Sequence, residues 1–270
     1  MAVCNVDFIS LCNNVATKSD LPSLSFTPRY GPICRRHDVC ASRCVAYVLV
    51  DALCSLTSFT AVRIRPTTSQ DTVSIPARFQ RTVIQAASTT SVQVDSTQST
   101  PTAPTANGAQ VPPSAGPTKK QFYTFDQVHH PATSQHALYQ ATAEPLISRF
   151  LQGFNCTILA YGQTSSGKTY SMAGIDLDAD PSDPHNGMGI IPRSVSSIFQ
   201  RAKQMKEEHA GGWSYSVKSS FIEIYNEDLI DLLGEESVKR EVQIREDKDG
   251  HIIWGGLREV SVRNAGEVMK

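Results

Sequence analysis

Eight consecutive residues constrain the fold of this chain more than any other feature. The segment GQTSSGKT, residues 162–169, matches the pattern GxxxxGK[ST]. Its glycines let the backbone turn tightly, so that successive N–H groups point inward at an anion, and a helix beginning near Lys168 adds its positive dipole end. The short apolar run at residues 157–160 predicts a buried strand directly before the loop. This order of strand, loop and helix predicts a phosphate-binding loop in an α/β fold.

Each residue of the loop is a candidate ligand of a nucleoside triphosphate. Lys168 is expected to reach the β- and γ-phosphates, and the hydroxyl of Thr169 is expected to hold magnesium. A glycine-rich turn with a capping lysine is the alternative interpretation of the same letters. The predicted phosphate site consists of Gly162, Gln163, Thr164, Ser165, Ser166, Gly167, Lys168 and Thr169.

Charge and hydropathy exclude several functional classes. The chain has 25 Lys and Arg against 26 Asp and Glu, a formal net charge of −1, so no chain-wide basic surface is available for nucleic acid. No apolar run reaches the roughly 18 residues that a membrane-spanning helix needs. The first residues also lack the basic start and apolar core of a signal peptide. We therefore expect no nucleic-acid partner, no membrane partner and a cytoplasmic location.

Two stretches differ in composition from the rest. Residues 1–58 hold six of the seven cysteines, whose spacing fits no familiar zinc pattern, and we predict a poorly structured leader there. Within this leader, residues 45–51 look like an apolar strand that ends in a magnesium-binding aspartate. Because that run precedes the phosphate loop, we assign it no site. Residues 86–118, rich in Ser, Thr, Ala and Pro, predict a disordered insertion, since they cannot bury enough apolar surface.

Local periodicity predicts strands that alternate with helices, as in an α/β sheet. Strands are expected at 60–65, 122–125, 157–160 and 215–225, and a hairpin is expected around the turn at 247–250. A helix is predicted over 146–154, with Thr142 as its cap and Gly153 at its end. A second helix begins at Pro192, and a helical turn is predicted at 229–233.

The residues around the loop resemble the kinesin motor domain. The resemblance rests on FDQV at 125–128, on GFNCTILAYGQTSSGKTYSMAG at 153–174, on VRIRP at 62–66, on FIEIYNED at 221–228 and on IRED at 244–247. It covers about residues 59–66 and 119–270, and its loops are most similar to the chromokinesin (kinesin-4) group. It implies a P-loop NTPase fold over residues 59–270, a central mixed sheet with helices on both faces, and a C-terminal part that this chain lacks.

The resemblance also implies ligands and partners. The family binds ATP with Mg²⁺ and moves along microtubules, so tubulin is the expected partner and the cytoskeleton the expected location. Arg65 and Pro66 match the family's adenine contacts, with Arg63 nearby, and Tyr170 matches the position of an aromatic ring on the other adenine face. Arg245 and Lys248 are candidates for tubulin contact, and a solvated charged turn is the equally favoured alternative.

Hydrolysis in the family requires two further segments. We expect switch I (NxxSSRSH) and switch II (DxxGxE) both to be absent from this chain, since the resemblance places the first of them just beyond Lys270. We identify no catalytic residue in this chain. The resemblance also takes both neighbours of the P-loop strand from later in the chain, so residues 157–160 are expected to be unpaired on both sides unless another strand pairs with them. Two functions remain: the ATP-binding part of a microtubule motor, or a nucleotide-binding or interaction fragment without hydrolysis. Direction, cargo, processivity and oligomeric state do not follow from these residues.

Overall fold

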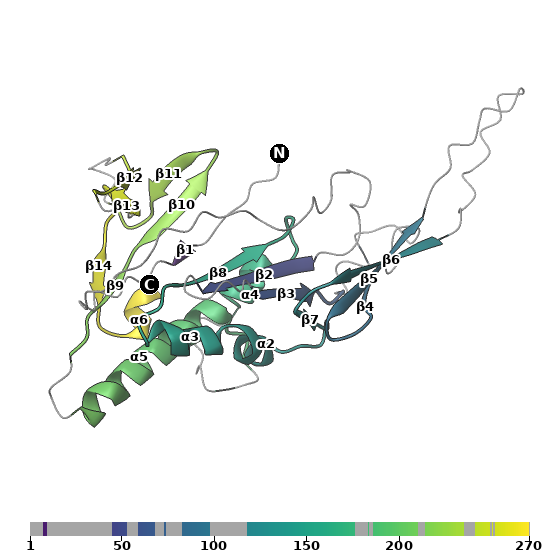
Figure 1. Ribbon diagram of the computed structural model, residues 1–270, viewed down its shortest axis with the longest axis horizontal. Coiled ribbons are helices and arrows are strands. Elements are labelled where there is room, and N and C mark those ends of the chain that lie inside the picture. Colours follow the sequence, from purple (N-terminus) through teal and green to yellow (C-terminus); the bar gives the residue numbers. More distant parts are fainter. Residues whose placement is uncertain are drawn as a thin grey trace, which may run out of the picture.

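A computed structural model describes residues 8–9, 45–52, 59–67, 73, 83–97, 118–175, 183, 186–209, 214–234, 241–248, 250 and 252–269. Its central feature is a four-stranded sheet in the order β7-β3-β2-β8 (Figure 1). Strand β3 is parallel to β7, whereas β2 is antiparallel to both of its neighbours, so the sheet is mixed, as expected. The four strands are β7 (Gln127–His129), β3 (Phe59–Ile64), β2 (Val45–Ala52) and β8 (Cys156–Tyr161).

Strand β2 comes from the segment that we predicted to be a poorly structured leader. Leu49 is paired with Thr60 of β3 on one side and with Leu159 of β8 on the other. The leader prediction is therefore wrong for residues 45–52, and β8 has a partner on one of its sides. An apolar run of this kind suits a strand that has neighbours on both edges. Apart from β1 (Phe8–Ile9), the rest of residues 1–58, including Cys34, Cys40 and Cys44, lies outside the described residues.

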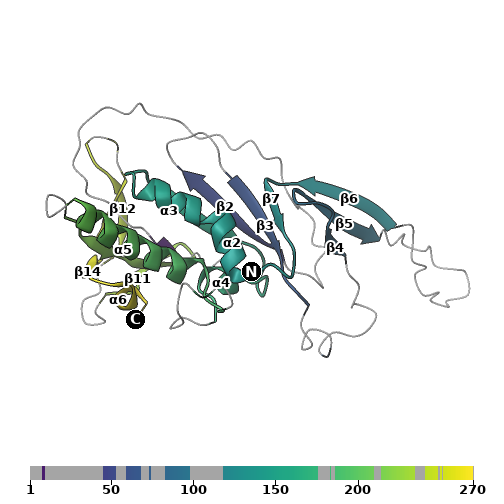
Figure 2. The ribbon, with the colours of Figure 1, turned by 90° about the horizontal axis from the view of Figure 1, so that it is seen from below.

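Helices cover one face of the central sheet (Figures 1 and 2). Strands bury alternate residues on opposite faces, and Ala61 of β3 packs on the helical face with Leu138, Met172 and Ile190. The predicted helix over 146–154 is shorter, and another helix precedes it. Thr142 is not its cap, because Thr142 ends the preceding helix and its hydroxyl donates to the Leu138 carbonyl. The helices are α2 (Gln135–Thr142), α3 (Glu144–Phe150), α4 (Lys168–Met172) and α5 (Ile190–Glu208).

A second, three-stranded sheet packs on the other face of β3. Val62 and Ile64 of β3 meet Val92 and Val128 there, so in the described part of the chain this face is covered by strands and not by the helices that we expected. The prediction that 86–118 is disordered is wrong for residues 86–97, because Ala86 ends strand β4 and residues 91–97 form a strand that pairs with β4 and with β6. Residues 98–117 lie outside the described part. The strands are β4 (Ile84–Ala86), β5 (Ser91–Thr97) and β6 (Thr118–Thr124).

The last third of the chain forms antiparallel pairs and a long helix. The hairpin predicted around residues 247–250 is confirmed, but the helical turn predicted at 229–233 is wrong, since these residues begin in strand β11. Asn226 and Glu227 both have positive φ, as a two-residue hairpin turn requires. The elements are β9 (Val217–Ser219), β10 (Phe221–Tyr225), β11 (Asp228–Asp231), β12 (Gln243–Glu246), β13 (Ile252–Gly255), β14 (Val260–Val262) and α6 (Ala265–Val268).

Among the residues that the structure describes, none of the helices has the length and apolar character that crossing a membrane demands.

Candidate phosphate-binding site

The glycine-rich loop joins β8 to α4. Gly167 has φ +94°, in the left-handed region that favours glycine, and Lys168 begins the helix in the next position. An added Cβ on Gly167 would meet no atom within 4 Å, so backbone conformation and not crowding requires glycine here. Ser165 also has a positive φ, 64°, which is uncommon for a residue with a side chain. The chain thus turns sharply at the start of α4, as the sequence predicted.

The ammonium group of Lys168 lies across the loop. Its Nζ donates to the carbonyl oxygens of Gly162 at 2.8 Å and of Gln163 at 2.9 Å. An ammonium group has three donors, so one remains beyond these two carbonyls. These contacts fix a positive charge at the loop, which is the charge that a phosphate group needs.

The remaining loop residues present different hydroxyl groups. Thr169 is exposed on the first turn of α4, so its hydroxyl is accessible to a cation. Ser166 is only 2% exposed, and its Oγ has no hydrogen-bond partner in the described structure. Buried hydroxyl groups are normally paired. The Ser166 hydroxyl is enclosed by the loop, whereas the open space at Gly167 leaves room for an anionic group beside the backbone.

Arg65 connects the loop to the end of strand β3. Its Nη1 donates to the carbonyl oxygen of Ser165 at 2.7 Å, although the two residues are 100 positions apart in the sequence. Pro66, the next residue, is exposed. The structure therefore brings the predicted pair Arg65 and Pro66 to the same loop as the predicted phosphate ligands.

Arg63 is buried beneath Tyr170. Its guanidinium carbon lies 4.9 Å from the centre of the Tyr170 ring, and only 5% of the residue is exposed. Its Nη1 donates to Gln135 Oε1 at 2.7 Å and to Ser171 Oγ at 3.0 Å, and its Nη2 donates to the Thr133 carbonyl at 3.3 Å. Burial lowers the pKa of this guanidinium from its usual value, and the nearby Tyr170 partly offsets that effect.

Gln135 completes this network and was not predicted. Its Oε1 accepts from Arg63, and its Nε2 donates to the carbonyl of Tyr170 at 2.5 Å. Gln135 is 3% exposed and opens helix α2, far from the loop in sequence. No motif marks it, because its role depends on the packing of α2 against α4. Tyr170 itself is 39% exposed, so one part of its ring faces solvent above Arg63.

The two residues proposed for tubulin contact lie on the hairpin of β12 and β13, away from the loop (Figure 1). Arg245 and Lys248 are both exposed. Arg245 donates from Nε and Nη2 to Gln243 Oε1, at 3.2 Å and 2.6 Å. Ile244 and Ile252 of the same hairpin are 55% and 60% exposed, so the surface combines basic and apolar groups.

One sequence segment matches a motif that we expected to be absent from this chain. Residues 231–236 read DLLGEE, which fits DxxGxE letter by letter. The carboxylate of Asp231 is bound to the backbone, because Oδ1 accepts from the Leu233 N–H at 3.0 Å and Oδ2 from the Arg258 N–H at 2.8 Å. This aspartate therefore holds the end of strand β11 in place. The pattern DxxGxE therefore does occur in this chain, contrary to our expectation. The contacts of Asp231, however, indicate a structural role for this segment.

A magnesium ion at the loop would have few protein ligands. Within the described residues, no three His, Cys, Asp or Glu side chains form a group that could hold a metal. Magnesium commonly keeps several waters and takes one or two protein oxygens together with substrate phosphates. The exposed hydroxyl of Thr169 beside the loop suits that mode of binding.

Comparison with known proteins gives a consistent result. The family model described as the kinesin motor domain matches residues 63–270. Kinesin-like protein KIN-5C of Nicotiana tabacum is 37% identical over 166 residues, which are 57% of this chain and 16% of that protein. Kinesin-like protein KIF27 of Homo sapiens is 39% identical over 151 residues, which are 56% of this chain and 10% of that protein.

A third relative, chromosome-associated kinesin KIF4 of Gallus gallus, is 38% identical over 148 residues, which are 54% of this chain and 12% of that protein. The chain thus spans a small fraction of the length of these relatives. Their names come from different kinesin groups, so the assignment to the chromokinesin group stays a prediction.

Proposed function

Because the chain belongs to the kinesin motor-domain family, we propose that it forms the ATP-binding part of a microtubule-based motor. The observation that carries the proposal is the meeting of two segments that are 100 positions apart in the sequence. Gly167 lies in the loop, Lys168 and Tyr170 lie in helix α4 directly after it, and Arg65 follows the end of strand β3. These segments combine a fixed positive charge, a helix N-terminus and an exposed aromatic ring.

Each group has a distinct task in the proposed site. The loop N–H groups and Lys168 bind the phosphates, while the Thr169 hydroxyl is a ligand of Mg²⁺, which supplies charge neutralisation at the phosphates when bound. Tyr170 and Pro66 offer the two surfaces against which the adenine base packs. Arg63 supports Tyr170 from below through the network with Gln135 and Ser171. Gln163, Thr164, Ser165 and Ser166 complete the turn of the loop.

The hairpin of β12 and β13 is the proposed contact with tubulin. Arg245 and Lys248 supply basic groups for an acidic partner surface, and the exposed isoleucines beside them supply apolar area. This contact would place the protein on the microtubule cytoskeleton.

A fragment that binds nucleotide without hydrolysing it is the second candidate function. It is favoured by the contacts of Asp231, whose two carboxylate oxygens are bound to backbone N–H groups of the same part of the chain. Both candidates need the same phosphate loop, so nucleotide binding tests what they share and turnover separates them.

Replacing Tyr170 with alanine is expected to weaken Mg·ATP several-fold while leaving inorganic triphosphate almost unchanged. Stacking of a base on an aromatic ring contributes about 1–3 kcal/mol, and triphosphate has no base. Calorimetric titration of both ligands measures the difference. Tyr161→Ala is a matched control, because Tyr161 is an exposed tyrosine on the strand before the loop. Equal weakening of both ligands by Tyr170→Ala would contradict the adenine assignment.

Turnover by the 270-residue chain is expected to stay at background, with and without polymerised tubulin. In-line attack on the γ-phosphate requires an oriented water and stabilised developing charge. Lys168 and Thr169 position phosphates, but no described residue beside them is placed to orient water. Steady-state phosphate release measures this rate, and a longer chain that contains NxxSSRSH and a further DxxGxE is expected to restore it. Strong stimulation of this chain alone would show that other residues supply those functions.

A further inference from the structure

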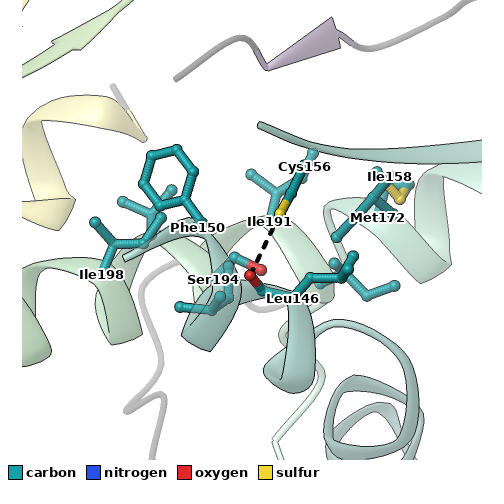
Figure 3. Close-up of a pocket in the computed structure, with 11 residues that line it drawn as sticks. Leu146, Phe150, Cys156, Ile158, Met172, Ile191, Ser194 and Ile198 are labelled. Carbon is teal, nitrogen blue, oxygen red and sulfur yellow. Dashed lines mark hydrogen bonds between the residues drawn. The ribbon is translucent and has the colours of Figure 1, made fainter. Parts of the chain in front are cut away.

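Helices α3 and α5 each have an apolar side and a polar side. Figure 3 shows the apolar side, where Leu146 and Phe150 of α3 and Ile198 of α5 lie beneath strand β8. The polar side borders a separate cleft, which has a volume of about 230 Å³ and shares no residue with the phosphate loop. Six residues with polar groups line this cleft from α2, α3 and α5: Tyr139, Glu144, Ser197, Gln200, Arg201 and Gln204.

Helix α5 supplies one continuous wall of the cleft. Its lining residues follow Ser197 by three, four and seven positions, so they lie on one face of the helix. Tyr139 of α2 lies across from this wall, and its hydroxyl shares a hydrogen bond of 2.7 Å with Ser197 Oγ. The two hydroxyl groups use one hydrogen between them, so one O–H is left for an acceptor.

Two opposite charges line the cleft without forming an ion pair with each other. In the described part of the chain, neither the Glu144 carboxylate nor the Arg201 guanidinium has a salt bridge or a hydrogen bond. Glu144 is half-buried and Arg201 is exposed, so a dissolved molecule reaches both. Burial is the main cause of the raised pKa of Tyr139; of these two charges, Glu144 raises that pKa further and Arg201 lowers it. Both charges therefore act on the same hydroxyl from different helices.

We propose that this cleft binds a small zwitterion, a molecule with an ammonium group at one end and a carboxylate at the other. The ammonium group donates to Glu144, and the carboxylate accepts from Arg201. Ile147, which also lines the cleft, contacts the carbon chain between the two charged groups. A simple anion or cation leaves one of the two protein charges without a partner. The volume is that of roughly seven or eight water molecules, which suits a ligand with about as many non-hydrogen atoms.

γ-Aminobutyrate is a suitable probe, because its flexible chain lets the distance between its two charges adapt. Pentanoate has a methyl group in place of the ammonium group, and butylammonium has a methyl group in place of the carboxylate. Saturation-transfer NMR titrations of the full chain at low ionic strength measure all three, since salt screens such contacts. We expect saturable binding of γ-aminobutyrate and about tenfold weaker binding of the other two, because each lacks one charge-assisted contact.

Two substitutions, each with a matched control, test the two contacts separately. Arg201→Gln is expected to weaken γ-aminobutyrate about tenfold and to bind it no better than butylammonium. Glu144→Gln is expected to weaken it by a similar factor and to bind it no better than pentanoate. Lys203→Gln and Glu207→Gln remove the same charges from exposed positions outside the cleft, so they are expected to bind γ-aminobutyrate as the original chain does.

Both substitutions in the cleft are expected to leave the fold intact, because neither side chain is held by a hydrogen bond in the described structure. Thermal unfolding of each variant checks this. The proposal is overturned if γ-aminobutyrate shows no saturable binding to the original chain, or if pentanoate or butylammonium binds as tightly. It is equally overturned if Arg201→Gln retains the affinity of Lys203→Gln, or if Glu144→Gln retains that of Glu207→Gln.

Discussion

Replacing Lys168 with alanine is expected to abolish measurable binding of Mg·ATP. The substitution removes the fixed positive charge that lies across the loop, together with the two hydrogen bonds from Nζ to Gly162 and Gln163. A hydrogen bond to a charged group contributes about 1.5–3 kcal/mol, and contact with a phosphate uses the same charge. The lost phosphate contact alone lowers the affinity at least about tenfold, and loosening of the loop, which also loses both of its hydrogen bonds to Nζ, is expected to lower it below the measurable range. Calorimetry or a fluorescent nucleotide analogue measures this affinity.

The matched control removes a lysine that is far from the loop. Lys203 lies on helix α5, and its side chain is 74% exposed and forms only a weak pair with Glu207 at 4.0 Å. Lys203→Ala removes the same charge from the chain and is expected to leave nucleotide affinity unchanged, because exposed ion pairs contribute little. If Lys168→Ala retained the original affinity, the assignment of the phosphate site would be wrong.

Replacing Val48 with proline is expected to destabilise the whole domain. Val48 lies in the middle of β2, opposite Ala61 of β3 and Ala160 of β8. Proline has no backbone N–H and is poorly tolerated in a strand with neighbours on both sides. The unpaired partner group and the distorted strand together cost on the order of 3 kcal/mol. In a domain of this size, that loss lowers the Tm by about 6–12 °C.

Thermal unfolding followed by circular dichroism measures this change, and Val48→Thr is the control. Threonine keeps the N–H group and the β-branched shape that strands favour, so it is expected to shift the Tm much less. An unchanged Tm in the proline variant would show that residues 45–52 do not pair with β3 and β8. The experiment therefore tests directly the pairing of a strand that lies within the segment predicted to be a poorly structured leader.

The phosphate loop was predictable because its geometry depends on neighbouring residues. The left-handed conformation of Gly167, the helix that starts at Lys168 and the hairpin around residues 247–250 all follow from local backbone preferences. The same holds for the strand before the loop, whose apolar run is bounded by turn residues. Such features need no information about partners elsewhere in the chain.

Strand partners and buried polar contacts, in contrast, were decided by the tertiary structure. Residues 91–97 have the composition of a disordered segment, yet they form β5 because β4 and β6 bind both of their edges. Residues 45–52 become a central strand because β3 and β8 flank them. Backbone hydrogen bonds in a sheet join residues that are distant in sequence, so local composition does not determine them.

The residues around Tyr170 show the same difference between what the sequence predicts and what the tertiary structure decides. The resemblance of the sequence to the kinesin motor domain predicted that Arg63, Arg65 and Tyr170 lie near the phosphate loop. Only the tertiary structure decided that Arg63 lies buried beneath the ring while Arg65 binds the loop carbonyl of Ser165. Residues two positions apart in a strand lie on the same face, so alternation does not separate the two arginines. Arg65 lies just beyond the end of β3, and the elements packed around each side chain set its contacts. Gln135, which joins Arg63 to the backbone of Tyr170, reaches the site only because helix α2 packs beside α4.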